Sequence, residues 1–461
     1  MTRTQLHNIP FDDLQVGMEA TQTRVLHPDD LYVFANSSGN LNPMHLPKED
    51  GDGDGAPEAL APPMWIASLV SALLGCELPG PGTVYRSQSL RFVSQAQAGD
   101  TLTVRVKLLE KAEGRRVRFA TTVETQDGRP VLEGEAEVIA PARALSFDLS
   151  DLPGLILKDH EHFDRLLEAA APLPPMRTAV VAPEEADALA GPILAARHTL
   201  IEPILVGEPT RIAAAAAAAG LDISGFEIVP AQDAKAAAAQ AVALIHEGRA
   251  QALMKGHLHT DTFLGAILAR DVGLRTGRRL SHVFVMDVPG LDHLLMVTDA
   301  AINIAPDLME KADIVQNAID LAHSLGLAEP RVGILSAIET VNPAIPSTLD
   351  AAILSKMADR GQITGGLVDG PLAMDNAVNL AAARTKGIQS LVAGRAEILV
   401  APNMEAGNML AKELTYLAHA QSAGIVLGAR CPVILTSRAD DDKSRLASCA
   451  VAVLHAARSG T

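Results

Sequence analysis

Apolar and polar side chains alternate along the chain between residues 101 and 138. Leu102, Val104 and Val106 occupy every second position, and the segments 117–123 and 132–138 repeat the alternation. A period of two is typical of strands that bury one face. The dipeptide Asp127-Gly128 separates the second segment from the third, and it is a strong signal for a hairpin turn. The pattern therefore predicts antiparallel strands.

A second pattern precedes these strands. Residues 64–74 (MWIASLVSALL) are apolar or small on every side. A helix of this kind has no polar face for solvent, so it has to be enclosed. The N-terminal part is therefore expected to be an α+β domain in which a sheet wraps around one buried helix.

The rhythm changes after residue 176, where short apolar runs alternate with longer helical patterns. We expect strands at 178–181, 204–207, 226–229 and 252–254, with helices at 184–198, 213–219 and 234–246 between them. Alternating strands and helices favour an α/β fold with a mostly parallel sheet covered on both faces. We expect a first domain at residues 1–145, a linker at 146–176 and a second domain at 177–461.

Length and charge narrow the function classes. A chain of 461 residues is long enough for two or three domains. Its net charge of -17 argues against general nucleic-acid binding, which depends on Lys and Arg. The N-terminus lacks the apolar region of a signal peptide and no apolar run is long enough for a membrane span, so we expect a cytoplasmic protein without a membrane partner. The three cysteines, Cys76, Cys431 and Cys449, lack metal-ligand spacing and are interpreted as buried apolar residues.

Polar residues follow several predicted strands of the second domain. Because ligands of open α/β sheets bind beyond the carboxyl ends of strands, we expect five such ends to outline one crevice. Four of them supply the candidate substrate-binding residues Lys255, Ser336, Glu339 and Asp369 and the polar end at 401–403. The fifth is Ser437-Arg438-Ala439-Asp440, after the strand 432–435. A helix cap with solvated charges is the alternative interpretation of this last segment.

Four motifs of the second domain resemble those of the phosphate acetyl/butyryltransferase family. They are TDAAINIAPDL (298–308), VDGPLAMDNA (368–377), EAGNMLAKEL (405–414) and the SRAD segment, and the similarity runs from about residue 177 to 455. The resemblance implies acyl transfer between coenzyme A and inorganic phosphate, on a fold similar to isocitrate and isopropylmalate dehydrogenases. It implies no metal and no nicotinamide, with coenzyme A and phosphate as substrates rather than bound cofactors. Asp299 and Asn303 lie in the first motif and are candidate substrate-binding residues.

The SRAD segment fits this chemistry. The thiolate of coenzyme A is the nucleophile, so a carboxylate base is useful, and Asp440 is the nearest candidate. Asp441 and Asp442 follow it, and the choice among the three stays open. Ser437 can donate to the oxyanion of the transition state, and Arg438 can bind phosphate through two hydrogen bonds.

A second arginine is expected on a dianionic phosphate. Acetyltransferases of this family tend to carry an arginine where this chain has Leu264. Arg275, Arg278 and Arg279 lie downstream in a segment that resembles the butyryl branch, and they are candidate phosphate-binding residues. A solvated loop is the alternative interpretation. The length of the acyl chain therefore stays open.

The first domain resembles MaoC-like, R-specific enoyl-CoA hydratases in residues 34–45 and 78–92. The resemblance implies a hot-dog fold and a catalytic Asp–His pair five residues apart. His45 is present, but Asn40 stands in the Asp position and cannot accept a proton. Loss of a general base typically costs about 10² to 10⁴ in rate, so we expect hydratase activity to be reduced or lost.

The segment before the buried helix also departs from the family. Family members have His-Gly there, whose backbone N–H binds the thioester oxygen, whereas this chain has Pro62 and Pro63, which have no N–H. The acidic residues of the run 49–54 are candidates to replace the missing carboxylate, although a solvated loop is the simpler interpretation. A calcium loop is set aside because the EF-hand spacing is absent.

The sequence therefore predicts an acyl-CoA-binding hot-dog domain fused to a phosphate acyltransferase, in a homo-oligomer. Two other enzymes remain as alternatives: a fully bifunctional hydratase and acyltransferase, and a decarboxylating dehydrogenase. A first domain that only binds and assembles is the non-catalytic alternative.

Overall fold

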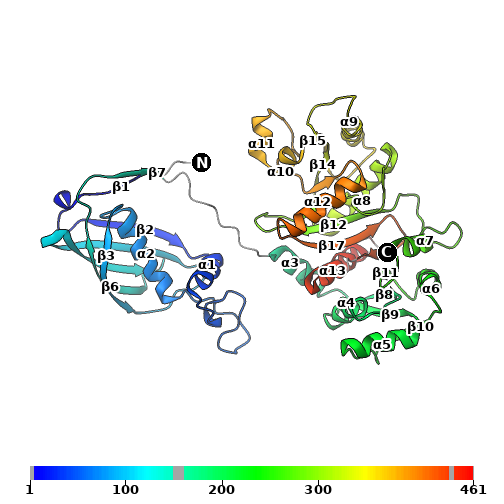
Figure 1. Ribbon diagram of the computed structural model, residues 1–461, viewed down its shortest axis with the longest axis horizontal. Helices are drawn as coiled ribbons and strands as arrows, with labels where there is room; N and C mark the ends of the chain where they lie inside the picture. Colours follow the sequence, from blue (N-terminus) through cyan, green and yellow to red (C-terminus); the bar gives the residue numbers. More distant parts are fainter. Residues whose placement is uncertain (1–4, 149–159, 436–440, 460–461) are drawn as a thin grey trace. The chain divides into compact units, whose positions relative to one another are not determined.

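The computed structural model describes residues 5–148, 160–435 and 441–459. The chain forms two compact units, residues 1–155 and 156–461, and each is described by itself (Figure 1). Among the described residues, no helix has both the length and the apolar character needed to cross a bilayer.

The first unit is a five-stranded antiparallel sheet packed against one helix. Its strand order is β2-β4-β5-β6-β3, and β1 and β7 form a separate two-stranded sheet. The elements are β1 (Gln5–His7), β2 (Glu19–Val25), α1 (Pro28–Ser38), η2 (Pro43–His45), α2 (Pro63–Cys76), β3 (Val84–Phe92), β4 (Thr101–Ala112), β5 (Arg116–Glu124), β6 (Pro130–Ile139) and β7 (Ser146–Asp148).

The predicted alternation is confirmed in this unit, whereas the predicted helix is buried on one side only. On β4, every second side chain is buried in the core of the unit: Leu102, Val104 and Val106. The side chains between them, Thr103 and Arg105, are not buried. Gly128 adopts a φ of 77° in the β5–β6 turn, a conformation that favours glycine. Six side chains of α2 are buried in the same apolar cluster as the strands: Trp65, Ile66, Leu69, Val70, Leu73 and Leu74. The other side of α2 is exposed: Met64 is 58% exposed, and Ser68, Ser71, Ala72 and Cys76 are exposed as well. The expectations of a helix enclosed on every side and of a buried Cys76 are therefore wrong, whereas Cys431 and Cys449 are buried as expected.

The second unit is built on an eleven-stranded mixed sheet in the order β10-β9-β8-β11-β18-β17-β12-β13-β16-β14-β15. Its strands are β8 (Met176–Val181), β9 (Ile201–Gly207), β10 (Glu227–Pro230), β11 (Ala252–Lys255), β12 (Ser281–Asp287), β13 (Leu295–Thr298), β14 (Arg331–Leu335), β15 (Leu367–Leu372), β16 (Ile398–Val400), β17 (Gln421–Leu427) and β18 (Val433–Ile434). The predicted α/β alternation and the mostly parallel pairing are confirmed.

Helices cover both faces of this sheet (Figure 1). Apolar residues of α4, α8 and α13 pack in one cluster on one face, whereas those of α6, α7 and α12 pack on the other. The helices are α3 (Glu161–Ala170), α4 (Ala186–Arg197), α5 (Pro209–Ala219), α6 (Ala234–His246), α7 (Thr260–Ile267), α8 (Leu308–Ser324), α9 (Pro346–Asp359), α10 (Met374–Val378), α11 (Leu380–Thr385), α12 (Met404–Tyr416) and α13 (Asp442–Ser459).

The segment expected as a linker, residues 146–176, contains two ordered elements. β7 pairs with β1 and belongs to the first unit. α3 belongs to the second unit, where Phe163 is fully buried and its backbone N–H donates to Asp287 Oδ2 at 2.8 Å. The first domain therefore extends to β7, and the second domain begins with α3, before residue 177.

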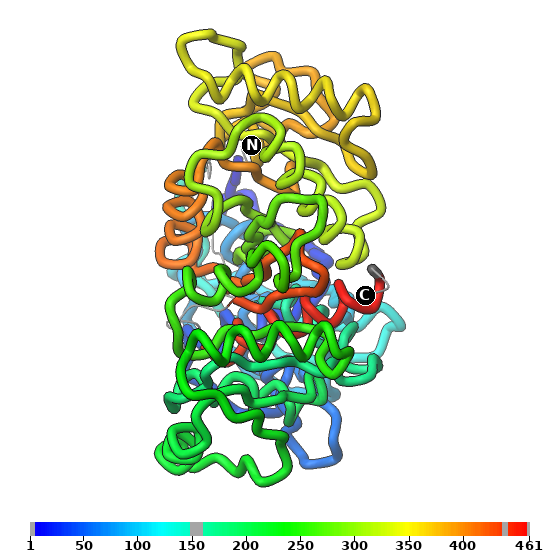
Figure 2. The backbone as a smooth tube through the Cα atoms, turned by 90° about the vertical axis from the view of Figure 1, so that its right-hand side faces the viewer, coloured from blue at the N-terminus to red at the C-terminus, as the bar shows by residue number. Residues whose placement is uncertain are grey.

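The strands of the large sheet run in two opposite directions. β8, β9, β10, β11 and β18 are mutually parallel, and so are β13, β14, β15 and β16. Three antiparallel pairings, β18–β17, β17–β12 and β12–β13, reverse the direction between the two groups. In Figure 2 the late segments coloured red lie between the green and the yellow-orange parts, which agrees with the central place of β17 and β18.

This reversal of strand direction contradicts the expectation of a single crevice. The carboxyl ends of β11 and β18 lie at one edge of the sheet, whereas those of β14, β15 and β16 lie at the opposite edge. The prediction that five strand ends outline one crevice is therefore wrong.

Candidate active site

The carboxyl ends of β8, β11 and β18 form the first candidate site. The register pairs Leu253 with Val433 and Met254 with Ile434, which places Lys255 level with Leu435. The next two residues of the chain after Lys255 fold back onto β8, because Gly256 N–H donates to Val181 O at 2.9 Å and His257 N–H donates to Ala182 O at 2.8 Å. Residues that follow three neighbouring strands are thereby held at one edge, as expected for ligand sites of α/β sheets.

A small cavity of about 70 Å³ opens at this edge, and charged groups line it. His257 Nδ1 lies 3.0 Å from Glu185 Oε2, and both residues border the cavity. Lys255 and Arg445 border it from β11 and from the first turn of α13. The site thus combines an imidazole–carboxylate pair with two cationic groups, which suits it to anions and to proton transfer.

The predicted catalytic residues Ser437, Arg438 and Asp440 lie outside the described residues. The described chain on either side of them borders the site: Leu435 is level with Lys255, and Arg445 lines the cavity.

The aspartates at the start of α13 have structural partners. Asp441 Oδ1 accepts a hydrogen bond from Ser444 N–H at 2.8 Å, and its Oδ2 accepts one from Gln421 Nε2 at 3.1 Å. This is the geometry of a helix N-cap. Asp442 forms an exposed ion pair with Arg445 at 3.7 Å.

Arg279, Asn303 and Asp299 form a second, connected group beyond the end of β13. Arg279 Nε donates to Asn303 Oδ1 at 2.7 Å, and Asn303 Nδ2 donates to Asp299 Oδ2 at 2.5 Å. Asp299 Oδ1 also accepts the N–H groups of Ala301 and Ile302, so this carboxylate is occupied in holding its own loop. Arg279 is further paired with Glu310 at 2.9 Å. The network fixes the direction of the half-exposed Arg279 guanidinium.

The other two arginines of this segment are placed differently. Arg278 forms an exposed ion pair with Asp320 on α8 and lines a cavity of about 890 Å³ at the end of β17. Arg275 is exposed, and its backbone forms an isolated bridge with Ala429. The structure therefore does not bring the three arginines to a common point.

Ser336, Glu339 and Asp369 lie in the far part of the sheet. β14 is six strand spacings from β11, which corresponds to about 29 Å at the usual spacing. Ser336 Oγ contacts Ser347 Oγ at 2.8 Å, and Asp369 Oδ1 accepts from Gly370 N–H. The hydrogen bond from Lys386 lowers the pKa of Glu339, which keeps this exposed pair charged. These residues form a separate polar region.

His282 is a buried residue that the sequence did not single out. It lies on the same sheet face as Val426 and Val433, close to Gly424, where a Cβ would lie 3.1 Å from its Nε2. Neither ring nitrogen has a hydrogen-bond partner among the described residues. Burial lowers the pKa of His282 to about 4, although the Asp299 carboxylate favours the protonated ring. The ring is therefore neutral at physiological pH.

The first unit keeps an oriented histidine. His45, in η2, places Nδ1 2.9 Å from Leu60 O, which selects the tautomer protonated on Nδ1 and leaves Nε2 as the basic nitrogen. Asn40 follows α1, and its Oδ1 accepts from Asn42 N–H at 3.3 Å. An amide at this position orients the turn but cannot act as a base.

The two prolines stand at the N-terminus of α2. Pro62 is the N-cap and Pro63 the first helical residue, without a side-chain cap. The N–H of Trp65 donates to Pro62 O at 2.9 Å. Neither proline offers a donor to a thioester oxygen there.

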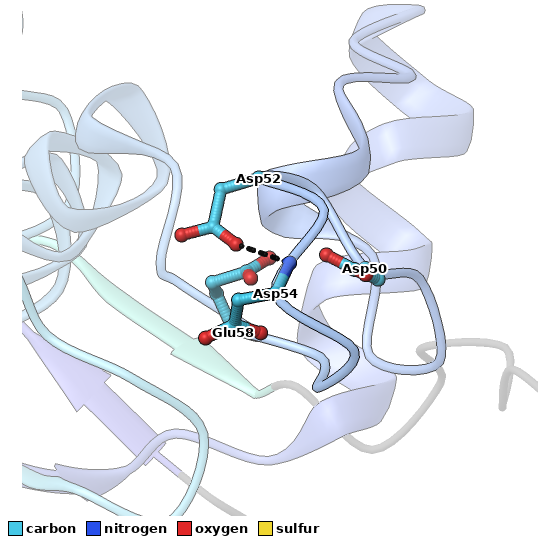
Figure 3. A group of neighbouring side chains, drawn as sticks. All are labelled: Asp50, Asp52, Asp54 and Glu58. Carbon is cyan, nitrogen blue, oxygen red and sulfur yellow. Dashed lines mark hydrogen bonds between the residues drawn. The ribbon is translucent and has the colours of Figure 1, made fainter.

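The acidic loop 50–58 gathers four carboxylates, Asp50, Asp52, Asp54 and Glu58, whose nearest oxygens lie within 4.8 Å of one another (Figure 3). Backbone N–H groups of Gly55 and Gly53 lower the pKa of Asp50. The loop is largely exposed and held by its own hydrogen bonds, among them Asp54 N–H to Asp52 Oδ1 at 3.1 Å. Each of the four carboxylates accepts at least one backbone N–H of its own loop, whereas the buried Glu58 Oε1 has no hydrogen-bond partner among the described residues.

The sequence does not single out three residues of this cavity, because no local motif joins them: Glu185, His257 and Arg445. They come from three distant parts of the sequence and meet because β8 lies beside β11 in the sheet and α13 begins beside both. The one signal in the sequence is a histidine that follows a strand end, two residues after Lys255.

Comparison with known proteins gives two family matches. Residues 231–453 match the family described as phosphate acetyl/butaryl transferase, and residues 13–128 match the MaoC like domain. A phosphate acetyltransferase of Rhizobium meliloti is 60% identical over 296 residues, which cover 64% of this chain and 94% of the relative. A phosphate butyryltransferase of Clostridium beijerinckii is 43% identical over 298 residues, covering 65% and 99%.

A solved structure is also similar to the second unit. The branched-chain phosphotransacylase from Enterococcus faecalis V583 superposes with a TM-score of 0.54 at 31% identity, covering 61% of this chain and 98% of that one. The expected hot-dog relationship of the first unit rests on the MaoC match. The chain belongs to the phosphate acetyl/butyryltransferase family, with a MaoC-like domain ahead of the transferase domain.

Proposed function

We propose that the second unit catalyses the reversible reaction of acyl-CoA with inorganic phosphate to give acyl phosphate and coenzyme A. The observation that carries this proposal is the 60% identity to a phosphate acetyltransferase across nearly the whole of that relative. Lys255 and Arg445 at the cavity agree with anionic substrates.

We assign roles within this proposal to the SRAD segment. Arg438 binds phosphate, Ser437 donates to the carbonyl oxygen as negative charge develops there, and Asp440 is a candidate base. Arg279, held by Asn303 and Glu310, is the better oriented of the upstream arginines for a second contact with an anion.

The test is release of free thiol from acyl-CoA of two to six carbons, with and without phosphate. Phosphate-dependent release supports the proposal and gives the chain-length preference, which the acetyl and butyryl relatives leave open. The change Arg438→Ala removes the activity while far-ultraviolet circular dichroism stays unchanged. Full activity in this variant would place phosphate binding elsewhere.

We propose that the first unit binds acyl-CoA with reduced or no hydration activity. Asn40 lacks the proton-accepting group, and Pro63 lacks the N–H that would bind the thioester oxygen. Wild-type protein should hydrate crotonyl-CoA far more slowly than it transfers acyl groups. Hydration at a comparable rate would favour the bifunctional alternative.

We further propose the fold relationship, substrates, localisation and assembly that the sequence predicts. The opposed strand directions of the large sheet agree with a fold similar to isocitrate and isopropylmalate dehydrogenases. Coenzyme A and phosphate are taken as substrates without a bound cofactor, and the protein is taken as a cytoplasmic homo-oligomer. A nicotinamide-dependent absorbance change with hydroxy acids would favour the dehydrogenase alternative, and a solution mass of one chain would exclude the oligomer.

A further inference from the structure

We infer that a phosphate ester of nucleotide size binds in the cavity of about 890 Å³ at the end of β17. The inference goes beyond the proposed acyl transfer and does not depend on it, because this cavity and the small one beyond β11 share no lining residue. Three observations carry it: the place of the cavity in the fold, its charge and its size.

The cavity lies where the chain passes between two parts of the large sheet. Residues 268–280 lead from α7 to β12, and residues 428–432 lead from β17 to β18. The two connections are held together, because Arg430 N–H donates to Leu274 O at 2.9 Å. Both connections line the cavity. Its backbone walls are therefore formed before any ligand binds, as is usual for small-molecule sites.

The C-terminal parts of α8 and α13 complete the lining of the cavity. Arg458 Nη1 of α13 donates to His323 O of α8 at 2.9 Å. Ser324 Oγ of α8 lies 2.9 Å from His455 Nδ1 of α13, so a second hydrogen bond joins the same two helices. Four segments that are distant in the sequence thus meet around one space.

Cationic groups outnumber carboxylates around this cavity, although the whole chain has a net charge of -17. Arg278, Arg430 and Arg458 line it, whereas Asp320 is the one carboxylate among the described residues that do so. Asp320 is paired with Arg278. Within the described part of the chain, Arg430 and Arg458 have no carboxylate partner. Guanidinium groups in this state favour an anionic ligand, and their planar fork fits a phosphate group.

Stabilisation of helix C-termini is the alternative role for these cations, because arginines near the last carbonyl groups of a helix stabilise it. Arg458 acts in this way on α8 through His323 O. Arg430 does not, since it lies in the connection 428–432 and its exposed side chain donates to no helix carbonyl among the described residues. The role of Arg430 is therefore left to a ligand.

The size of the cavity exceeds the needs of an inorganic anion. Its volume of about 890 Å³ lies in the range of sites for organic ligands, roughly 300 to 1,000 Å³. Leu427, Cys431 and Pro432 are buried and add apolar lining beside the arginines. A phosphate ester that carries a ring system matches both the apolar and the cationic parts of this lining.

The cavity lies well away from the first candidate site, and α13 joins the two. Arg445 lines the small cavity beyond β11, and Arg458 lines the large cavity. These residues are thirteen positions apart on one helix, which corresponds to about 20 Å along its axis. A ligand in the large cavity therefore contacts the far end of that helix and leaves the small cavity open.

The experiment measures the binding of ADP and of inorganic pyrophosphate to the full-length protein by isothermal titration calorimetry, with and without coenzyme A. The test variant combines Arg430→Gln with Arg458→Gln. The matched control combines Arg360→Gln with Arg384→Gln, which removes the same charge from exposed arginines of the same unit. We expect ADP to bind the wild type and the control equally, and the test variant at least about ten-fold more weakly. Phosphate-dependent thiol release should stay unchanged in both variants.

ADP should also bind more tightly than pyrophosphate, because only ADP reaches the apolar lining. Equal affinities for the two would contradict a ligand of nucleotide size. No binding of ADP by the wild type, or equal weakening in the test variant and the control, would overturn the site. Far-ultraviolet circular dichroism checks the fold, and Arg430→Gln alone, which removes no side-chain hydrogen bond among the described residues, repeats the test if the double variant misfolds.

The titrations with coenzyme A separate two sources of the same chemistry, since coenzyme A itself contains a phosphorylated adenosine. If coenzyme A leaves ADP bound, the ligand is a separate nucleotide. If coenzyme A displaces ADP and the test variant weakens the binding of both, the nucleotide part of coenzyme A is the ligand. ADP that coenzyme A displaces but that binds the test variant as tightly as the wild type occupies another site, and the inference fails.

Discussion

Two neighbouring glutamates show how strongly local contacts divide the roles of identical residues. Glu184 is buried and holds the start of α5 through Glu208 N–H and Arg211, whereas Glu185 is half-exposed and contacts His257. The sequence Glu-Glu carries no sign of this difference. The difference lies in the partners that each side chain meets in the folded unit.

At the residue scale, His282 predicts a pH dependence of stability. Its pKa falls from 6.5 to about 4 on folding, so the unfolded chain binds a proton that the folded chain excludes. The stabilisation from the neutral ring is present above pH 6.5 and is lost as the pH falls toward 4, by roughly 3 kcal/mol.

The measurement compares urea unfolding of the wild type and His282→Phe by circular dichroism between pH 4.5 and 7. Phenylalanine keeps a ring and does not titrate, so the variant should lose less stability on acidification. If the free energy of unfolding depends on pH in the same way in both proteins, the low pKa of His282 is contradicted.

Asp441 allows capping and proton transfer to be separated. Asparagine caps helices about as well as aspartate but is no base, whereas alanine does neither. Asp441→Ala should destabilise the second unit by about 1 kcal/mol, and Asp441→Asn should not. Thermal unfolding together with thiol-release assays checks both points, and loss of kcat in Asp441→Asn alone would make Asp441 the base.

At the element scale, strands and helices with a clear period were predictable. The alternation in 101–138 and the strand–helix rhythm from 178 to 254 match β4 to β6 and β8 to β11. Local periodicity reports which face of an element is buried, and that depends on nearby residues only.

The direction of each strand in the sheet was not predictable in the same way. Lys255 and Ser336 both follow apolar runs, but they lie at opposite edges because β17 and β12 reverse the sheet between them. That reversal depends on pairings between distant segments. For the same reason the pair Glu185–His257 could not be predicted from the sequence, whereas Asp299 and Asn303, four residues apart in one motif, could be.

Two substitutions, at Asn40 and at the N-terminus of α2, should together be needed to restore hydration of crotonyl-CoA by the first unit. Asn40→Asp supplies a carboxylate for His45, but the first turn still has Pro63 where an N–H is needed. We expect little crotonyl-CoA hydration from Asn40→Asp and a clear gain from Asn40→Asp combined with Pro63→Gly. Equal rates in the single and the double variant would show that the helix start does not limit the reaction.

At the scale of the whole molecule, the two units have separate cores and should unfold separately. Trp65, the single tryptophan of the chain, lies in the core of the first unit. Its fluorescence therefore reports that unit, whereas far-ultraviolet circular dichroism is dominated by the larger second unit. The two signals should give different urea midpoints, and coincident transitions would indicate that the units fold as one.

The central claim is that the second unit joins an acyl thioester and a phosphate ion in one reaction. The most direct measurement is the initial rate of coenzyme A release from acetyl-CoA and butyryl-CoA as phosphate is varied from zero. We expect a rate that rises from near zero and saturates with phosphate, with acyl phosphate formed in equal amount to free thiol. A rate that does not depend on phosphate would contradict it.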